Sequence, residues 1–128
     1  MGPRVGSFDA GFGTAYLARV VGEKRAREIW FLCEQYDAAT AERWGLVNKV
    51  VAPQELMNAA RDWAGKISHL SPTALKTLKH SFNADSEHIG GLQSLAFDVL
   101  DLYTDTDEAK EGGKAFTEKR APDFKKFR

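Results

Sequence analysis

The chain has 128 residues, of which 43% are apolar and 28% are charged, and its formal net charge is +0. This size and composition are typical of one globular domain and argue against disorder. The balanced charge gives no general attraction to nucleic acid or to an anionic membrane surface. Because no uninterrupted apolar stretch approaches the ~20 residues of a membrane span, we expect a cytoplasmic protein without membrane or nucleic-acid contacts.

A glycine-rich segment over residues 2–13 opens the sequence. It predicts a loop, because glycine permits sharp turns and close backbone approach. Asp9 or Thr14 is suited to cap the helix that follows. Helical periodicity and helix-start residues then predict a mainly α-helical chain. The expected helices cover residues 15–21, 23–35, 38–44, 53–70, 71–82, 85–102 and 106–119.

One segment departs from the helical pattern. Residues 46–51, Leu-Val-Asn-Lys-Val-Val, are rich in β-branched side chains and predict a short strand. A single strand cannot form a sheet, because its backbone groups need a partner. The pattern therefore indicates one or two short strands in a chain that is incomplete or that pairs with another chain.

The cysteine and histidine residues give no sign of a redox or metal site. Cys33 is the only cysteine and lies in an apolar run. It is expected to be a buried, inert thiol in a reducing compartment. His69, His80 and His88 lack the spacing of metal ligands and are expected on solvated helix surfaces. We therefore expect no bound metal.

The glycine-rich start carries a recognisable motif. Residues 2–13, Gly-Pro-Arg-Val-Gly-Ser-Phe-Asp-Ala-Gly-Phe-Gly, resemble the signature of 1,4-dihydroxy-2-naphthoyl-CoA synthases (naphthoate synthases) in the crotonase, or enoyl-CoA hydratase/isomerase, superfamily. Gly-Leu-Val-Asn at 45–48 and Ser-Pro at 71–72 resemble segments that are generic to crotonases. The resemblance covers essentially the whole chain. It implies the carboxyl-terminal half of an α/β crotonase-like fold.

This resemblance also implies how the chain is organised. Residues 1–51 would hold the active-site loop, helices and a strand, and residues 52–128 a helical oligomerisation region. In the family, an amino-terminal half supplies most of the CoA pocket and the two backbone N–H groups that bind the thioester oxyanion. That half is missing from these 128 residues. We therefore expect a homo-oligomer, a trimer or hexamer, that is inactive until such a half is supplied.

The implied reaction is an intramolecular Claisen condensation in menaquinone biosynthesis. A carbanion beside the thioester of o-succinylbenzoyl-CoA attacks the aromatic carboxyl carbon and closes a naphthol ring. By resemblance, Ser7 would bind the ring portion of this acyl-CoA substrate. Asp9 would orient or protonate groups at the ring-closing end. From spacing alone, the alternative is that Ser7 or Asp9 caps the following helix.

Further site residues are implied by resemblance. Gly2 and Trp30 match residues at a hydrogencarbonate, which acts as the base in family members with glycine at the first position. No other cofactor is expected to bind tightly. The alternative for Trp30 is a core aromatic, and the two roles do not exclude each other. Phe116 and Lys119 match residues of the final helix that reach the CoA of a neighbouring subunit, although Lys119 also suits a solvated charged run.

One position departs from the family pattern. Thr104 stands where the family has a catalytic tyrosine, and its hydroxyl is shorter and less acidic than a phenol. The adjacent Tyr103 would replace that tyrosine only if the helix end rotates, since one residue turns a helical side chain by about 100°. Two alternatives remain open, because ring-opening relatives resemble the same region and because the oxyanion hole is expected outside these residues. One is a ring-opening 2-oxocycloalkyl-CoA hydrolase, and the other is a non-catalytic helical oligomerisation module.

Overall fold

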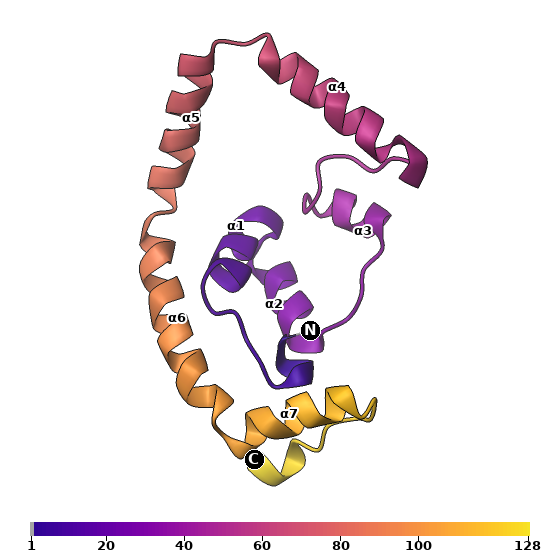
Figure 1. The fold of residues 1–128 in the computed structure, drawn as a ribbon, viewed down its shortest axis with the longest axis vertical. Coiled ribbons are helices and arrows are strands. Elements are labelled where there is room, and N and C mark those ends of the chain that lie inside the picture. Colours follow the sequence, from indigo (N-terminus) through magenta and orange to yellow (C-terminus); the bar gives the residue numbers. More distant parts are fainter. Residues whose placement is uncertain (1) are drawn as a thin grey trace. The chain divides into compact units, whose positions relative to one another are not determined.

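The computed structural model describes residues 2–128 and consists of helices joined by loops (Figure 1). The chain forms two compact units, residues 2–35 with 88–128 and residues 36–87. The α-helices are α1 (Leu17–Val21), α2 (Glu23–Leu32), α3 (Ala38–Arg43), α4 (Leu56–Ser68), α5 (Pro72–Asp85), α6 (His88–Thr104) and α7 (Asp107–Thr117). Shorter turns of 3₁₀- or π-helix are η1 (Gly2–Val5), η2 (Phe12–Tyr16), η3 (Pro53–Glu55) and η4 (Lys125–Phe127). The prediction of a mainly helical chain is confirmed.

Local capping chemistry determines where several helices begin. Asp37 caps α3, where its Oδ1 accepts a hydrogen bond from the Thr40 N–H at 2.7 Å. Ser71 and Thr106 cap α5 and α7 in the same way. Each cap satisfies a backbone N–H group that the first turn of a helix leaves unpaired. These starts agree with the sequence because a cap involves only neighbouring residues.

The first two α-helices differ from the prediction at their ends. α1 lies within the expected range 15–21 but is preceded by the π-helical turn η2. Gly22 separates α1 from α2 in a conformation with φ 84°, as a helix stop requires. α2 ends early, at Leu32, because Cys33 adopts a left-handed conformation with φ 52°. The Cys33 thiol is half-buried, and it donates a hydrogen bond to the Trp30 carbonyl at 3.2 Å.

The expected strand over 46–51 does not form, and no segment of residues 2–128 is a β-strand. Residues 46–51 instead form a bend and an irregular connection between α3 and η3. A strand needs a backbone partner, and the described part of the chain offers none. The Val50 N–H donates to the Glu42 carboxylate at 2.9 Å. The strand prediction is therefore corrected to an irregular connection.

The first unit contains the only apolar core found within residues 2–128. Ile89 of α6 and Ala115 of α7 are each 1% exposed. The complete set of buried apolar residues in the described chain is Val21, Ala26, Ile89, Ala96 and Ala115. The core is therefore small and lies where α6 and α7 meet the amino-terminal segment.

Helix α7 lies directly on the backbone of η1. Gly6 and Gly112 are both buried, and Gly6 has φ 66°. A Cβ on Gly112 would lie 2.5 Å from backbone atoms of Val5 and Gly6, closer than real Cβ atoms approach. Glycine at 112 therefore allows the helix to approach the segment that leads to Ser7.

The second unit, residues 36–87, has no buried apolar residue. Leu56, Trp63 and Ile67 recur at helical spacing along α4, and they are 60%, 42% and 53% exposed. An apolar stripe on an amphipathic helix normally packs against another surface. This stripe therefore predicts a further contact that covers α4.

Candidate functional site

The site loop, residues 7–13, follows η1 and carries both predicted catalytic residues. Ser7 and Asp9 are half-buried. Asp9 Oδ1 accepts a hydrogen bond from the Gly11 N–H at 3.2 Å. The other carboxylate oxygen of Asp9 lies so close to Gly13 that a Cβ there would clash with it. Asp9 therefore folds back onto its own loop, and the start of η2 has no side-chain cap from within the loop.

The two catalytic candidates are placed by the backbone and by the residue between them. The Ser7 N–H donates to the Gly2 carbonyl at 3.1 Å. The Phe8 ring packs against Tyr103 of α6, with ring centroids 5.6 Å apart. This contact fixes the part of the loop that separates Ser7 from Asp9.

Tyr103, and not Thr104, faces the site loop. Tyr103 is half-buried, and burial, followed by the charge of Glu108 and a hydrogen bond to it, raises the pKa of the phenol. Thr104 is exposed, and its hydroxyl donates to the Asp101 carbonyl at 2.8 Å within its own helix. Tyr103 therefore reaches the loop without any rotation or unwinding of α6.

The sequence did not predict a second contact between α6 and the site loop. The Phe12 N–H donates to Gln93 Oε1 at 2.8 Å. Gln93 follows Ile89 by four positions and precedes Ala96 by three, so it lies on the buried face of α6. A polar residue on such a face needs a hydrogen-bond partner, and this was the available signal.

The structure brings Gly2 and Trp30 together. A Cβ on Gly2 would clash with the six-membered ring of Trp30. The Trp30 indole N–H donates to the Gly13 carbonyl of the site loop. The indole therefore fills the space beside Gly2, and its N–H is already hydrogen-bonded to the protein backbone. This arrangement does not fit a hydrogencarbonate at Gly2 and Trp30 while the Gly13 contact persists, and we assign no chemical step to that anion.

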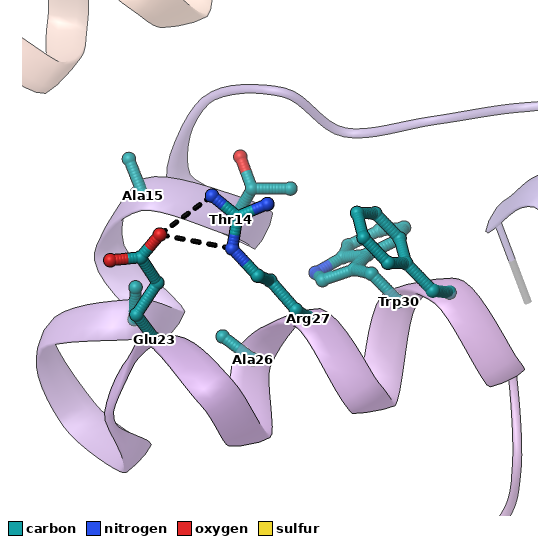
Figure 2. Close-up of a pocket in the computed structure, with 8 residues that line it drawn as sticks. Thr14, Ala15, Glu23, Ala26, Arg27 and Trp30 are labelled. Atoms are coloured by element: carbon teal, nitrogen blue, oxygen red, sulfur yellow. Dashed lines mark hydrogen bonds and ion pairs between the residues drawn. The ribbon is translucent and has the colours of Figure 1, made fainter.

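Trp30 also lines a cavity of about 390 Å³ beside α2 (Figure 2). Arg27 and Glu23 form an ion pair there at 2.6 Å, and both side chains are largely exposed. The other lining residues are mostly apolar: Thr14, Ala15, Ala18, Ala26 and Phe31. This cavity can accept an apolar or aromatic group.

Phe116 and Lys119 lie at the end of α7 and line a second cavity, of about 570 Å³, together with Arg4 and Cys33. Phe116 is 63% exposed. Lys119 has φ 54°, a left-handed backbone conformation that residues other than glycine rarely adopt. The structure therefore brings the two predicted CoA contacts to one cavity, which is also lined by Arg4, Arg120 and the acidic Glu34.

The chain matches the enoyl-CoA hydratase/isomerase family model over residues 1–127. It belongs to the enoyl-CoA hydratase/isomerase family. This confirms the superfamily that the site-loop motif indicated. The resemblance to the naphthoate synthase branch of this family stays a prediction.

Several solved structures share this fold. The carnitinyl-CoA hydratase from Mycobacterium avium matches with a TM-score of 0.86 and 26% identity over 97% of this chain and 49% of that chain. The enoyl-CoA hydratase/isomerase from Pseudoalteromonas atlantica T6c matches with a TM-score of 0.82 and 26% identity, over 94% and 49% of the two chains. DspI from Pseudomonas aeruginosa is 35% identical, with a TM-score of 0.61, over 95% and 48%. The 128-residue chain thus spans about half the length of the structures it matches.

Within residues 2–128, no helix is both long and apolar enough to span a membrane. The same residues contain no group of three or more His, Cys, Asp or Glu side chains arranged to hold a metal ion.

A carboxylate clamp holds the turn that contains Lys119. Arg120 donates from both Nη atoms to the two oxygens of Glu111, at 2.6 and 3.1 Å. The Asp123 N–H donates to Glu111 Oε1 at 2.9 Å. These bonds lower the pKa of Glu111 to about 2, and the bond from Arg120 has the larger effect. The clamp therefore fixes the chain after α7 against the helix and sets the backbone around Lys119.

We expect the contribution of this clamp to depend on pH. The pKa of Glu111 falls from 4.5 to about 2 on folding, so its stabilisation is complete above about pH 4.5 and is lost as the pH falls through about 2. Glu111→Gln should therefore melt at a lower temperature than the native chain near pH 7, and the difference should shrink between these two pH values. Thermal melts followed by circular dichroism check this.

Glu118→Gln is the matched control for this pH experiment. Glu118 also pairs with Arg120, at 2.7 Å, but its side chain is 45% exposed, whereas that of Glu111 is 10% exposed. Loss of the Glu118 charge should change the melting temperature less than loss of the Glu111 charge, because exposed ion pairs contribute little to stability. A Glu111→Gln difference that is the same at every pH would contradict the assigned clamp.

Proposed function

We propose that this chain forms the carboxyl-terminal part of an acyl-CoA site whose reaction is the ring-closing condensation of a naphthoate synthase. The observation that supports this proposal is the geometry of the site loop. Its Val-Gly-Ser-Phe-Asp motif holds Ser7 and Asp9 half-buried, on a backbone fixed from α2 and α6. A loop held in this way can present a hydroxyl and a carboxylate to one small group of a substrate.

The condensation needs three kinds of group. A base removes the α-proton, an oxyanion hole stabilises the enolate oxygen, and donors assist the carboxyl oxygens that leave as water. Asp9 is proposed to orient or, in its protonated form, to protonate groups at the ring-closing end, because the Gly11 N–H holds its carboxyl group at a defined place in the loop. Ser7 is proposed to bind the ring portion of the substrate. The oxyanion donors are expected from the amino-terminal half of the fold.

We propose that the CoA of a neighbouring subunit binds at the end of α7. The adenine would lie against the exposed ring of Phe116, and Lys119 would contact a phosphate or carboxylate. The cavity there has about 570 Å³ and includes a further cation, Arg4. A glycine would adopt the backbone conformation of Lys119 at lower cost. That cost supports a role for the lysine side chain beyond ending the helix.

Ring opening by a 2-oxocycloalkyl-CoA hydrolase is the second candidate. The exposed Thr104 hydroxyl is bonded to its own helix and supplies no phenol at the position of the family tyrosine. Ring opening and ring closure share an enolate intermediate, so the loop motif suits both. Hydration of an enoyl-CoA, the activity that the names of several relatives describe, is the third reaction to compare.

Completing the enzyme tests this proposal. The chain would be co-expressed with the amino-terminal half of a naphthoate synthase and assayed with o-succinylbenzoyl-CoA, a 2-oxocycloalkyl-CoA and an enoyl-CoA. We expect weak ring closure. Turnover of only the oxocycloalkyl thioester would establish the hydrolase instead. Turnover of only the enoyl thioester would overturn both ring chemistries.

We also propose a homo-oligomer, a trimer or hexamer. The support is the exposed stripe of Leu56, Trp63 and Ile67 on α4, in a unit without a buried apolar residue. Light scattering at micromolar concentration should give a mass that is a multiple of 14.2 kDa. Trp63→Glu should lower that mass, because it places a charge in the stripe, whereas Asn58→Glu on the same helix should not. A clean monomer for the native chain would contradict the proposal.

A further inference from the structure

We propose that Gln93 is a positioning residue of the site, which fixes the site loop and thereby the carboxylate of Asp9. Its effect on catalysis rests on the proposed function. Its effect on the loop does not, and can be measured separately.

The first step concerns the place of Gln93 in α6. The inward face of this helix includes Ile89 and Ala96, which are 1% and 7% exposed. Gln93 lies between them on the same face and is itself half-buried. A half-buried amide oxygen gains from a hydrogen bond, because each loss of contact with water is costly without a partner. Its partner is the Phe12 N–H, at 2.8 Å.

The second step concerns what this bond does for the loop. Phe12 is the first residue of η2, so its N–H has no acceptor within that turn. Gln93, from a distant part of the sequence, therefore acts as the cap of η2. A Cβ on Gly11 would clash with the Gln93 side chain and would lie 2.8 Å from its Cα. Glycine at 11 thus allows α6 to approach the loop closely enough for the bond to form.

The third step links Gln93 to Asp9. The three consecutive residues 11–13 are each held by a different partner. Asp9 Oδ1 accepts from the Gly11 N–H, Gln93 Oε1 accepts from the Phe12 N–H, and the Trp30 indole donates to the Gly13 carbonyl. The segment that positions the Asp9 carboxylate is therefore itself held by α2 and α6. Loss of the Gln93 acceptor would release it on the α6 side.

Two substitutions separate the hydrogen bond from the size of the side chain. Gln93→Met keeps an unbranched side chain of similar length but removes the amide oxygen. Gln93→Glu keeps an acceptor oxygen at the same position. Ser94→Ala is the control, because Ser94 is exposed on the same helix and its hydroxyl donates only to the Gly90 carbonyl, at 3.3 Å.

Amide hydrogen exchange measured by NMR on the 128-residue chain gives the direct test. We expect Gln93→Met to speed exchange of the Phe12 N–H by on the order of five- to tenfold, as the loss of one hydrogen bond implies. Gln93→Glu and Ser94→Ala should leave it close to the native rate. An unchanged Phe12 rate in Gln93→Met, or an equally fast rate in Gln93→Glu, would overturn the proposal. If Gln93→Met does not fold, Gly11→Ala should displace Gln93 and speed the same exchange, and an unchanged rate would overturn the proposal.

The completed enzyme gives the second test. Gln93→Met should lower kcat by up to about a hundredfold with little change in KM, since small misplacements near the chemistry have effects of this size. Gln93→Glu should restore kcat. If the native completed enzyme turns over and Gln93→Met does not alter kcat, Gln93 does not position the site. If the native enzyme turns over no thioester while the Phe12 exchange responds as expected, the proposed function fails and the positioning role stands.

Discussion

Replacing Gly112 with alanine should destabilise the first unit by about 1–3 kcal/mol, the usual cost of adding a side chain to a packed contact. The new Cβ would lie 2.5 Å from the carbonyl carbon and oxygen of Val5 and from the nitrogen of Gly6. All three are backbone atoms, so no side-chain rotation relieves the clash. Either α7 moves away from η1, or the segment that leads to Ser7 shifts. The change should therefore disturb the site as well as the fold.

The neighbouring Gly113 provides the matched control. A Cβ on Gly113 would meet nothing within 4 Å. Alanine is favoured over glycine inside a helix by up to ~1 kcal/mol, so Gly113→Ala should stabilise the chain. Urea denaturation followed by circular dichroism measures both variants. Effects of the same sign and size at the two positions would show that α7 does not pack on η1 as described.

The second large effect that we expect is a lack of catalysis by the 128-residue chain on its own. Enolate formation beside a thioester depends on oxyanion donors, and losing even one typically costs ~10²–10³ in rate. The resemblance places both donors in the amino-terminal half, and this chain spans about half the length of the structures it matches. Ser7 and Asp9 can orient a carboxylate but cannot hold the charge on the thioester oxygen.

A spectrophotometric assay with o-succinylbenzoyl-CoA checks this expectation. The purified chain should give no ring-closed product above the uncatalysed rate. Adding the amino-terminal half of a family enzyme provides the positive control. Product formed by the chain alone would show that an oxyanion site exists within these residues and that the donors are wrongly assigned.

Features that depend on neighbouring residues are predictable from this sequence, whereas features that depend on distant residues are not. The helix starts at Asp37, Ser71 and Thr106 follow from neighbouring residues, because a cap depends only on the next three or four positions. The strand over 46–51 was predicted from β-branched composition alone, and it does not form because its pairing partner is not in the described chain. Strand propensity gave a wrong prediction here, because a strand forms only where a second strand pairs with it.

The candidate site shows the same division. The resemblance pointed to Gly2 and Trp30, and the structure places them in contact. That the indole N–H is donated to Gly13 depends on tertiary packing, which spacing along the chain does not contain. Gln93 is not indicated by the apolar periodicity of its helix, because that pattern contains only apolar positions. A polar residue on the face that contains Ile89 and Ala96 was a usable signal, although its partner, Phe12, was not predictable.

Ring-closing turnover by the completed enzyme, compared between the native chain and Asp9→Asn, tests the central claim most directly. Asp101→Asn, an exposed change on α6, is the control. The site described here predicts that Asp9→Asn lowers kcat by ~10² or more, as the loss of a positioned acid–base group does, while Asp101→Asn retains it. Full turnover in Asp9→Asn, with the native enzyme active, would contradict the assignment of the site loop as the catalytic part of this chain.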